Sequence, residues 1–232
     1  MKINTVAGAA SAAWFALVAC AVAAALSAPA CAAAGGMYGD PAAAANYWRQ
    51  QQYDDCVLMS SADVVGELTG TLPSEQAIIE MAQTTPSTVH PGSIYVKPVN
   101  TSDPDSGMGA DMRDVAALLA KYQVRAKLTD KDSAAETGIP TGIPGLEQAL
   151  GAGRKVIASV NSALIWHLPV TDRDEQGNPQ TDHAVVVTGV DSVNGIVHLN
   201  DSGAEDGRDE QVPVKLFSEA WDAGDDVMVV TT

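Results

Sequence analysis

The hydrophobic pattern of this chain changes its period near residue 151, and that change constrains the fold more than any other feature. Up to this point apolar residues mostly recur at the spacing of amphipathic helices. Beyond it, short β-branched runs are bounded by Gly, Asn and Asp, which is typical of strands. The predicted helices span 56–68, 75–82, 112–122, 144–150 and 216–221, and the predicted strands span 124–128, 155–160, 183–190, 196–199 and 226–230.

Helices followed by strands predict an α+β fold, in which N-terminal helices pack on a C-terminal antiparallel β-sheet. Two of the strands are joined through Val193-Asn194-Gly195, a sequence that resembles a β-hairpin turn. We therefore expect these two strands to pair. Residues 46–232 should form one domain with its own hydrophobic core.

The N-terminus is organised like a secretory signal peptide. A lysine precedes an apolar, Ala-rich run from residue 6 to residue 26, and Ala30 and Ala32 form the small-residue pattern that signal peptidase reads. We expect residues 1–32 to be the signal peptide and the Ala/Gly-rich residues 33–45 to be a flexible leader. The protein would then be secreted or held in the cell envelope.

Two alternatives would keep the chain at a membrane. An apolar run of about 21 residues is long enough to span a bilayer as a retained anchor. Leu17-Val18-Ala19 before Cys20 resembles a lipobox, and Cys31 is a weaker candidate for lipidation. The sequence predicts membrane contact only if the N-terminal segment is retained or lipidated.

A strong negative charge argues against polyanionic partners. The mature chain would keep 12 of its 13 basic residues and all 29 acidic ones. Phosphates would be repelled, so we expect no nucleic-acid partner. Asp172–Gly177 resembles the opening of a calcium loop, but His183 stands where the loop needs a glutamate. We expect no metal and no cofactor.

Cys56 would be the one cysteine of the mature chain, because Cys20 and Cys31 lie in the signal segment. An unpaired thiol in an oxidising compartment is a liability unless it is buried or used. Cys56 begins a predicted helix, whose dipole and exposed amides favour a thiolate. Gln50, six residues upstream, can fold back beside the thiol and, with the Cys56 amide, donate to an oxyanion.

A cysteine nucleophile needs a base, and the base needs an orienting group. Of the four histidines, His183 stands at the start of the strongest predicted strand, where a rigid backbone places its side chain at the edge of the sheet. The partner strand ends at Asn200 and Asp201, and either side chain could lie beside His183. The chain order Cys, His and then Asp or Asn is that of papain-like enzymes.

These motifs together resemble one family. Gln-x5-Cys before a helix, the stretch His-Ala-Val-Val-Val-Thr-Gly-Val-Asp and a strand ending in Asn-Asp are similar to the papain-like cysteine peptidases of family thirty-nine, relatives of the bacteriocin-leader peptidases. The resemblance covers roughly residues 46 to 231. It implies a papain-like fold and a peptide or protein substrate. It also implies Cys56 as nucleophile, His183 as base, Asp201 as orienting acid and Gln50 as oxyanion donor, with Asn200 and Gln51 as alternatives for the last two roles.

One departure from the family keeps two alternatives open. The family usually has Gly directly after the cysteine, whereas here Val57 can crowd the approach of a substrate. A catalytically degenerate peptidase fold that binds a partner is therefore one alternative. An NlpC-type cell-wall peptide hydrolase, suggested by Asp55-Cys56, is the other, although that family expects Ser-Gly where Val57-Leu58 follows.

Overall fold

The computed structural model describes residues 36–98 and 109–232. The expected signal peptide over 1–32, with Cys20 and Cys31, lies outside the described residues. Within the described part of the chain, no helix is long and apolar enough to cross a membrane.

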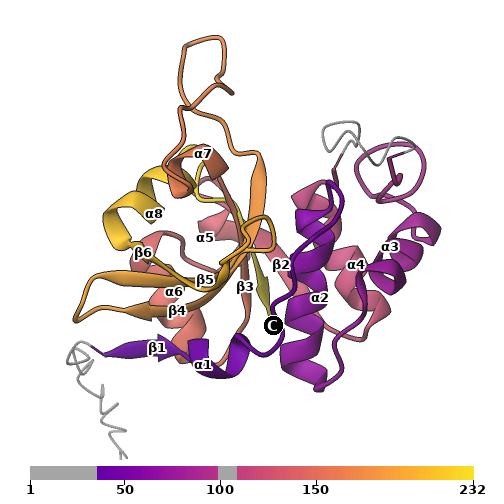
Figure 1. Ribbon diagram of the computed structural model, residues 1–232, viewed down its shortest axis with the longest axis horizontal. Helices are drawn as coiled ribbons and strands as arrows, with labels where there is room; N and C mark the ends of the chain where they lie inside the picture. The colour runs from indigo at the N-terminus through magenta and orange to yellow at the C-terminus, as the bar shows by residue number, and fades with distance from the viewer. Residues whose placement is uncertain (1–35, 99–108) are drawn as a thin grey trace, which may run out of the picture. The chain divides into compact units, whose positions relative to one another are not determined.

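Helices dominate the first half of the described chain and strands the second half, as the sequence predicts (Figure 1). The helices are α1 (Pro41–Ala44), α2 (Cys56–Thr69), α3 (Glu75–Thr84), α4 (Val115–Lys121), α5 (Ala134–Thr137), α6 (Gly142–Gly151), α7 (Ser162–Ile165) and α8 (Val214–Asp222), and a 3₁₀ turn at Met112–Asp114 precedes α4. The strands are β1 (Met37–Gly39), β2 (Ala126–Thr129), β3 (Val156–Val160), β4 (His183–Asp191), β5 (Ile196–Asn200), β6 (Arg208–Pro213) and β7 (Met228–Thr231).

The strands form one antiparallel sheet in the order β2-β7-β3-β4-β5-β6, and β1 pairs with the far end of β4. β4 and β5 are the hairpin expected from the turn at Asn194, with Val187 opposite Leu199 and Val186 opposite Asn200. This register brings the end of β5 alongside the beginning of β4. The predicted α+β class is confirmed.

Both faces of the central strands are buried, which explains their nearly continuous apolar sequence. Ala184 and Val186 of β4 face a core formed with α2, α3 and α4. Val185 and Val187 face a second core formed with α6 and α8. Successive residues of a strand point to opposite faces, so one run of valines serves two cores.

Helix α2 packs between strand β4 of the sheet and the helices α3 and α4 (Figure 1). Residues 56–66 are all buried, because α2 packs against β4 on one side and against α3 and α4 on the other. The helix ends at Gly70, whose φ of 74° lies in the left-handed region that glycine adopts without strain. Its first residue, Cys56, therefore occupies a fixed position.

Two parts of the structure differ from the sequence-based expectation. Residues 33–45 were expected to be a flexible leader, but β1 and α1 lie within them. Their order comes from backbone pairing with β4 and from the Asp40 carboxylate, which caps α1 by accepting a hydrogen bond from the Ala43 amide at 3.0 Å. Strand β6 was not expected, because its sequence Arg-Asp-Glu-Gln-Val-Pro has the polar composition of an edge strand.

Candidate active site

Three candidate residues from three elements meet at one end of the sheet. Cys56 is the first residue of α2, His183 is the first residue of β4, and Asp201 directly follows β5. All three are buried, with exposures of 8%, 7% and 0%. The helix start and the two strand ends fix their backbones, so the geometry does not depend on a long loop.

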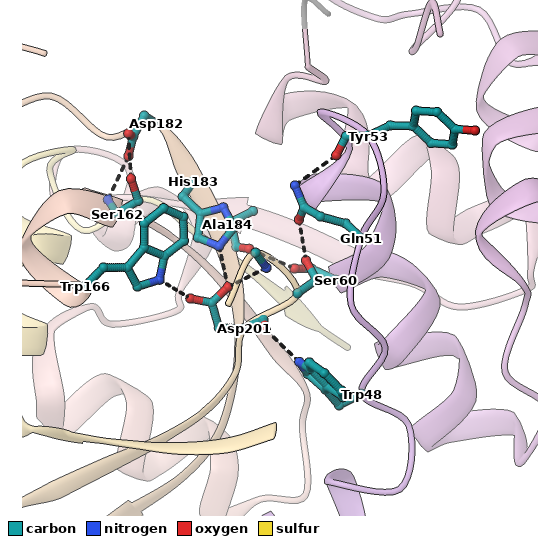
Figure 2. Close-up of polar contacts among 12 residues, drawn as sticks. Trp48, Gln51, Tyr53, Ser60, Ser162, Trp166, Asp182, His183, Ala184 and Asp201 are labelled. Carbon is teal, nitrogen blue, oxygen red and sulfur yellow. Dashed lines mark hydrogen bonds and ion pairs between the residues drawn. The ribbon is translucent and has the colours of Figure 1, made fainter. Parts of the chain in front are cut away.

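His183 and Asp201 form a direct pair, with 2.7 Å between Nε2 and Oδ1 (Figure 2). Asp201 also accepts hydrogen bonds from the Gly203 amide on Oδ1 and from the Trp166 indole on Oδ2, each at 2.8 Å. Burial alone would raise the pKa of Asp201, but His183 and these donors lower it below its usual value. The carboxylate therefore stays charged inside the protein.

The third candidate, Cys56, interacts with the same imidazole. Burial alone would lower the pKa of His183, but the Cys56 thiol and the Asp201 carboxylate together raise it well above its usual value. Because Asp201 accepts from Nε2, that nitrogen carries a proton and Nδ1 is left to exchange one with the thiol. An imidazole with a raised pKa therefore lies beside the one cysteine that the structure describes.

Asp201, and not Asn200, lies beside His183. Asn200 points to the other face of the sheet, where its amide nitrogen donates to Asp63 at 2.8 Å and to the Ala44 carbonyl at 3.0 Å. The three groups that reach the Asp201 side chain are all donors once Nε2 is protonated. An asparagine at position 201 has one acceptor oxygen, so its NH₂ group would face one of these three donors. A carboxylate has two acceptor oxygens, which explains the need for an aspartate at this position.

Trp166 and Gly203 were not anticipated from the sequence. The Trp166 ring lies 5.2 Å from the His183 ring, and its indole holds Asp201 from the other side (Figure 2). A Cβ on Gly203 would come within 3.0 Å of His183 Cε1 and 2.9 Å of the Trp166 ring. Trp166 therefore shields the pair from water, and residue 203 has no space for a side chain. The available sequence signal for Trp166 was its place at the end of an apolar segment.

Gln50 and Gln51, the two candidate oxyanion donors, face different surroundings. Gln50 is exposed and lines a cavity with Leu72 and Pro73 on the helical side. Gln51 is half-buried, accepts a hydrogen bond from the Ser202 hydroxyl at 2.7 Å and donates to the Tyr53 carbonyl at 3.0 Å (Figure 2). Ser202 directly follows Asp201. The structure thus brings Gln51, rather than Gln50, into contact with the segment that carries Asp201.

Val57 does not project into the solvent in front of Cys56. It is 5% exposed and packs in the core that α2 shares with α3 and α4. The side chain that replaces the family's glycine therefore contributes to the core.

Neither the other histidines nor a metal offers a competing centre in the described part of the chain. His198 forms a second His–Asp pair, with 2.7 Å between Nδ1 and Asp209 Oδ1, but Cys56 is the one cysteine that is described. His90 and His167 are exposed, and the described residues contain no cluster of His, Cys, Asp and Glu that could hold a metal ion.

An α+β fold of this kind, with helices packed on an antiparallel sheet, is shared with C39-like peptidases. A putative C39-like peptidase from Bacillus anthracis superposes with a TM-score of 0.52, covering 81% of this chain and 95% of that one at 18% identity. The sequence profile of the Peptidase_C39 like family matches residues 45–228. The chain belongs to this family, which confirms the resemblance noted in the sequence.

The curated relatives are full-length matches. The uncharacterized protein Rv1268c of Mycobacterium tuberculosis and the uncharacterized protein Mb1299c of Mycobacterium bovis are each 60% identical over 232 residues, covering 100% of both chains. The shared length includes the N-terminal segment. The overall organisation of this chain therefore recurs in these relatives.

Proposed function

We propose that this protein is an exported cysteine peptidase that hydrolyses a peptide or protein substrate through Cys56, His183 and Asp201. The observation that carries the proposal is the buried His183–Asp201 pair, whose ring also interacts with the thiol at the start of α2. Membership of a peptidase family agrees with this chemistry.

The mechanism follows from the proton positions. The thiol gives its proton to Nδ1 of His183, and Asp201 holds the ring through Nε2. The thiolate attacks the peptide carbonyl, and the imidazolium then protonates the leaving amine, so that a thioester and a free amine result. Water, deprotonated by His183, hydrolyses the thioester and regenerates the thiol.

The oxyanion of the tetrahedral intermediate needs two donors. The amide of Cys56 is one, because amides in the first turn of a helix have no acceptor within the helix. For the second we favour Gln51 over Gln50, because Ser202 and the Tyr53 carbonyl hold its amide on the Asp201 side. Gln50 would have to leave its exposed position to act.

Alkylation of Cys56 tests the proposal without knowledge of the substrate. A thiolate at pH 6 should react with iodoacetamide about 100 times faster than an ordinary thiol of pKa ~8.5, which is ionised to roughly 0.3% at that pH. Peptide mapping by mass spectrometry separates Cys56 from Cys20 and Cys31. A rate at pH 6 no faster than that of a free thiol would favour the non-enzymatic alternative.

Export is part of the proposal and rests on the apolar N-terminal run and the Ala30–Ala32 pattern. Protein collected from the culture medium or the cell envelope should have the intact mass of a chain that begins at Ala33. A mass that includes the first 32 residues would point to a retained anchor.

Replacing Trp166 with phenylalanine should lower the rate of peptide hydrolysis about tenfold. The variant keeps the aromatic ring but removes the donor to Asp201 Oδ2, and a hydrogen bond to a charged group contributes roughly 1.5–3 kcal/mol. Trp48→Phe is the matched control, since the Trp48 indole donates to the backbone oxygen of Asp201 and not to its carboxylate. Equal losses in both folded variants would contradict a specific role for Trp166.

A further inference from the structure

Glu210 is a half-buried acid near the candidate site that the mechanism does not use. It lies on β6 directly opposite Leu199 of β5. Cross-strand partners project from the same face, and so do residues two apart along a strand. Leu199 and Asp201 are two residues apart, so the Glu210 side chain lies diagonally from Asp201, on the face that carries the Asp201 and His183 side chains.

The surroundings of Glu210 disfavour the charged form of its carboxyl. Its Oε2 atom is buried and has no hydrogen bond among the described residues. Burial, followed by the negative charge of Asp201, raises the pKa of Glu210 to about 7, and the positive charge of His183 opposes this shift. Glu210 therefore changes its charge near neutral pH, next to the His183–Asp201 pair, whose imidazole must keep its proton.

The other charged groups near β6 are engaged elsewhere. On β6 itself, the Arg208 guanidinium stacks on Trp48 at 5.3 Å and Asp209 pairs with His198 of β5. Helix α8, which packs on β6, carries Lys215 and Glu219, which are exposed and pair with each other at 3.8 Å, and Asp222, which is exposed and pairs with Lys131. Helix α1 also contacts β6 and has no ionisable side chain. Asp201 and His183 are thus the ionisable groups whose charges act on Glu210.

We propose that Glu210 is a positioning residue that extends, toward alkaline pH, the range in which His183 remains protonated. When Glu210 releases its proton to solvent, its carboxylate becomes a second negative charge that stabilises the imidazolium. This inference rests on the proposed function, in which the imidazolium protonates the leaving amine. In acid the carboxyl is neutral and has no such effect, so the influence of Glu210 appears only above neutral pH.

A proton NMR titration of the histidines tests this coupling directly. In Glu210→Gln the His183 midpoint should fall by about one pH unit, as expected for the loss of one nearby opposite charge. Glu219→Gln, an exposed glutamate on α8, is the matched control and should not shift the midpoint. The His183 signal is assigned by its absence in His183→Gln. If Glu210→Gln does not fold, Glu210→Ala replaces it, and the same shift is expected.

The pH profile of peptide hydrolysis gives the functional readout. Glu210→Gln should move the alkaline limb of kcat/KM down by a similar amount and leave the acid limb unchanged, because the carboxyl is already neutral there. A His183 midpoint unchanged to within ~0.2 pH unit in the folded variant would overturn the role of Glu210, even if Cys56 alkylates rapidly. A shifted midpoint in a protein that cleaves no peptide would keep the coupling and reject the proposed function.

Discussion

His183→Gln is expected to slow alkylation of Cys56 at pH 6 about 100-fold and to reduce kcat/KM for peptide hydrolysis about 1000-fold. Without the imidazole, the thiol loses the base that accepts its proton. Its thiolate then forms only to the extent of an ordinary thiol, roughly 0.3% at pH 6. General acid–base catalysis contributes about 10²–10⁴ in rate. Hydrolysis needs it in two steps, when His183 protonates the leaving amine and when it deprotonates water.

Glutamine suits this experiment better than alanine. Its amide can still donate to Asp201 Oδ1, so the buried carboxylate keeps a partner and the fold is preserved. Alkylation is followed by mass spectrometry, hydrolysis by cleavage of a fluorescence-quenched peptide library, and folding by circular dichroism. A folded His183→Gln variant that reacted as fast as the wild type would remove His183 from the proposed mechanism.

His198→Gln is the matched control. His198 is buried to the same degree and is paired with a carboxylate at the same distance of 2.7 Å, but through Nδ1 and with Asp209. The substitution should leave both rates within about twofold of the wild type. The comparison therefore separates the effect of losing a buried His–Asp pair from the loss of the ring beside Cys56.

Much of the fold was predictable from the sequence because periodicity reports burial. The helix over Cys56–Thr69 and the β4–β5 hairpin follow from apolar spacing and from one turn motif. The β1–α1 segment escaped prediction because β1 is ordered by pairing with β4, which is distant in sequence, and strand β6 escaped because its polar sequence lacks the apolar alternation of a strand. A polar or Ala-rich segment does not encode such pairing locally.

The candidate site was predictable to a different extent for each residue. Cys56 and His183 each begin a regular element, so the sequence predicts that one lies at the start of a helix and the other at the start of a strand. Asp201 and Asn200 could be separated only by the register of β5, which turns neighbouring side chains to opposite faces. Gln50 and Gln51 lie in an irregular segment, where no periodicity indicates which of the two faces inward.

Asp55, the residue before Cys56, should make the stability of the protein fall steeply as pH rises from 5 to 8. The side chain is completely buried, and neither carboxyl oxygen has a hydrogen-bond partner among the described residues. Burial, followed by the charges of Glu75 and Asp54, raises the pKa of Asp55 from 3.8 to about 8. Asp55 is therefore neutral at neutral pH and places no charge next to Cys56.

The sign of the pH dependence follows from linkage. Between pH 4 and pH 8 the unfolded chain has lost the Asp55 proton while the folded protein still holds it, so each rise in pH favours unfolding. One pH unit corresponds to about 1.4 kcal/mol, which sets an upper bound of roughly 4 kcal/mol between pH 5 and pH 8. Allowing for relaxation around the buried charge, we expect about 2 kcal/mol.

Asp55→Asn should remove this part of the slope, because the amide cannot ionise. Unfolding by urea at pH 5 and at pH 8 gives the free energy of unfolding at each pH, and the loss between them should be about 2 kcal/mol smaller in the variant. Comparing the two pH values within one protein cancels the constant cost of burying a different side chain. Asp63, a second buried acid with a raised pKa, titrates in both proteins and so drops out of the difference.

Asp132→Asn provides the control for an exposed aspartate and should leave the slope unchanged. If Asp55→Asn had the slope of the wild type, Asp55 would have to be ionised in the folded protein, and a negative charge would then stand beside the thiolate. In that case Cys56 in the variant should also alkylate faster than in the wild type at pH 6. If Asp55 is neutral, Cys56 should alkylate at the same rate in Asp55→Asn and the wild type at pH 6. The free energy of unfolding of the variant should also depend less on pH than that of the wild type.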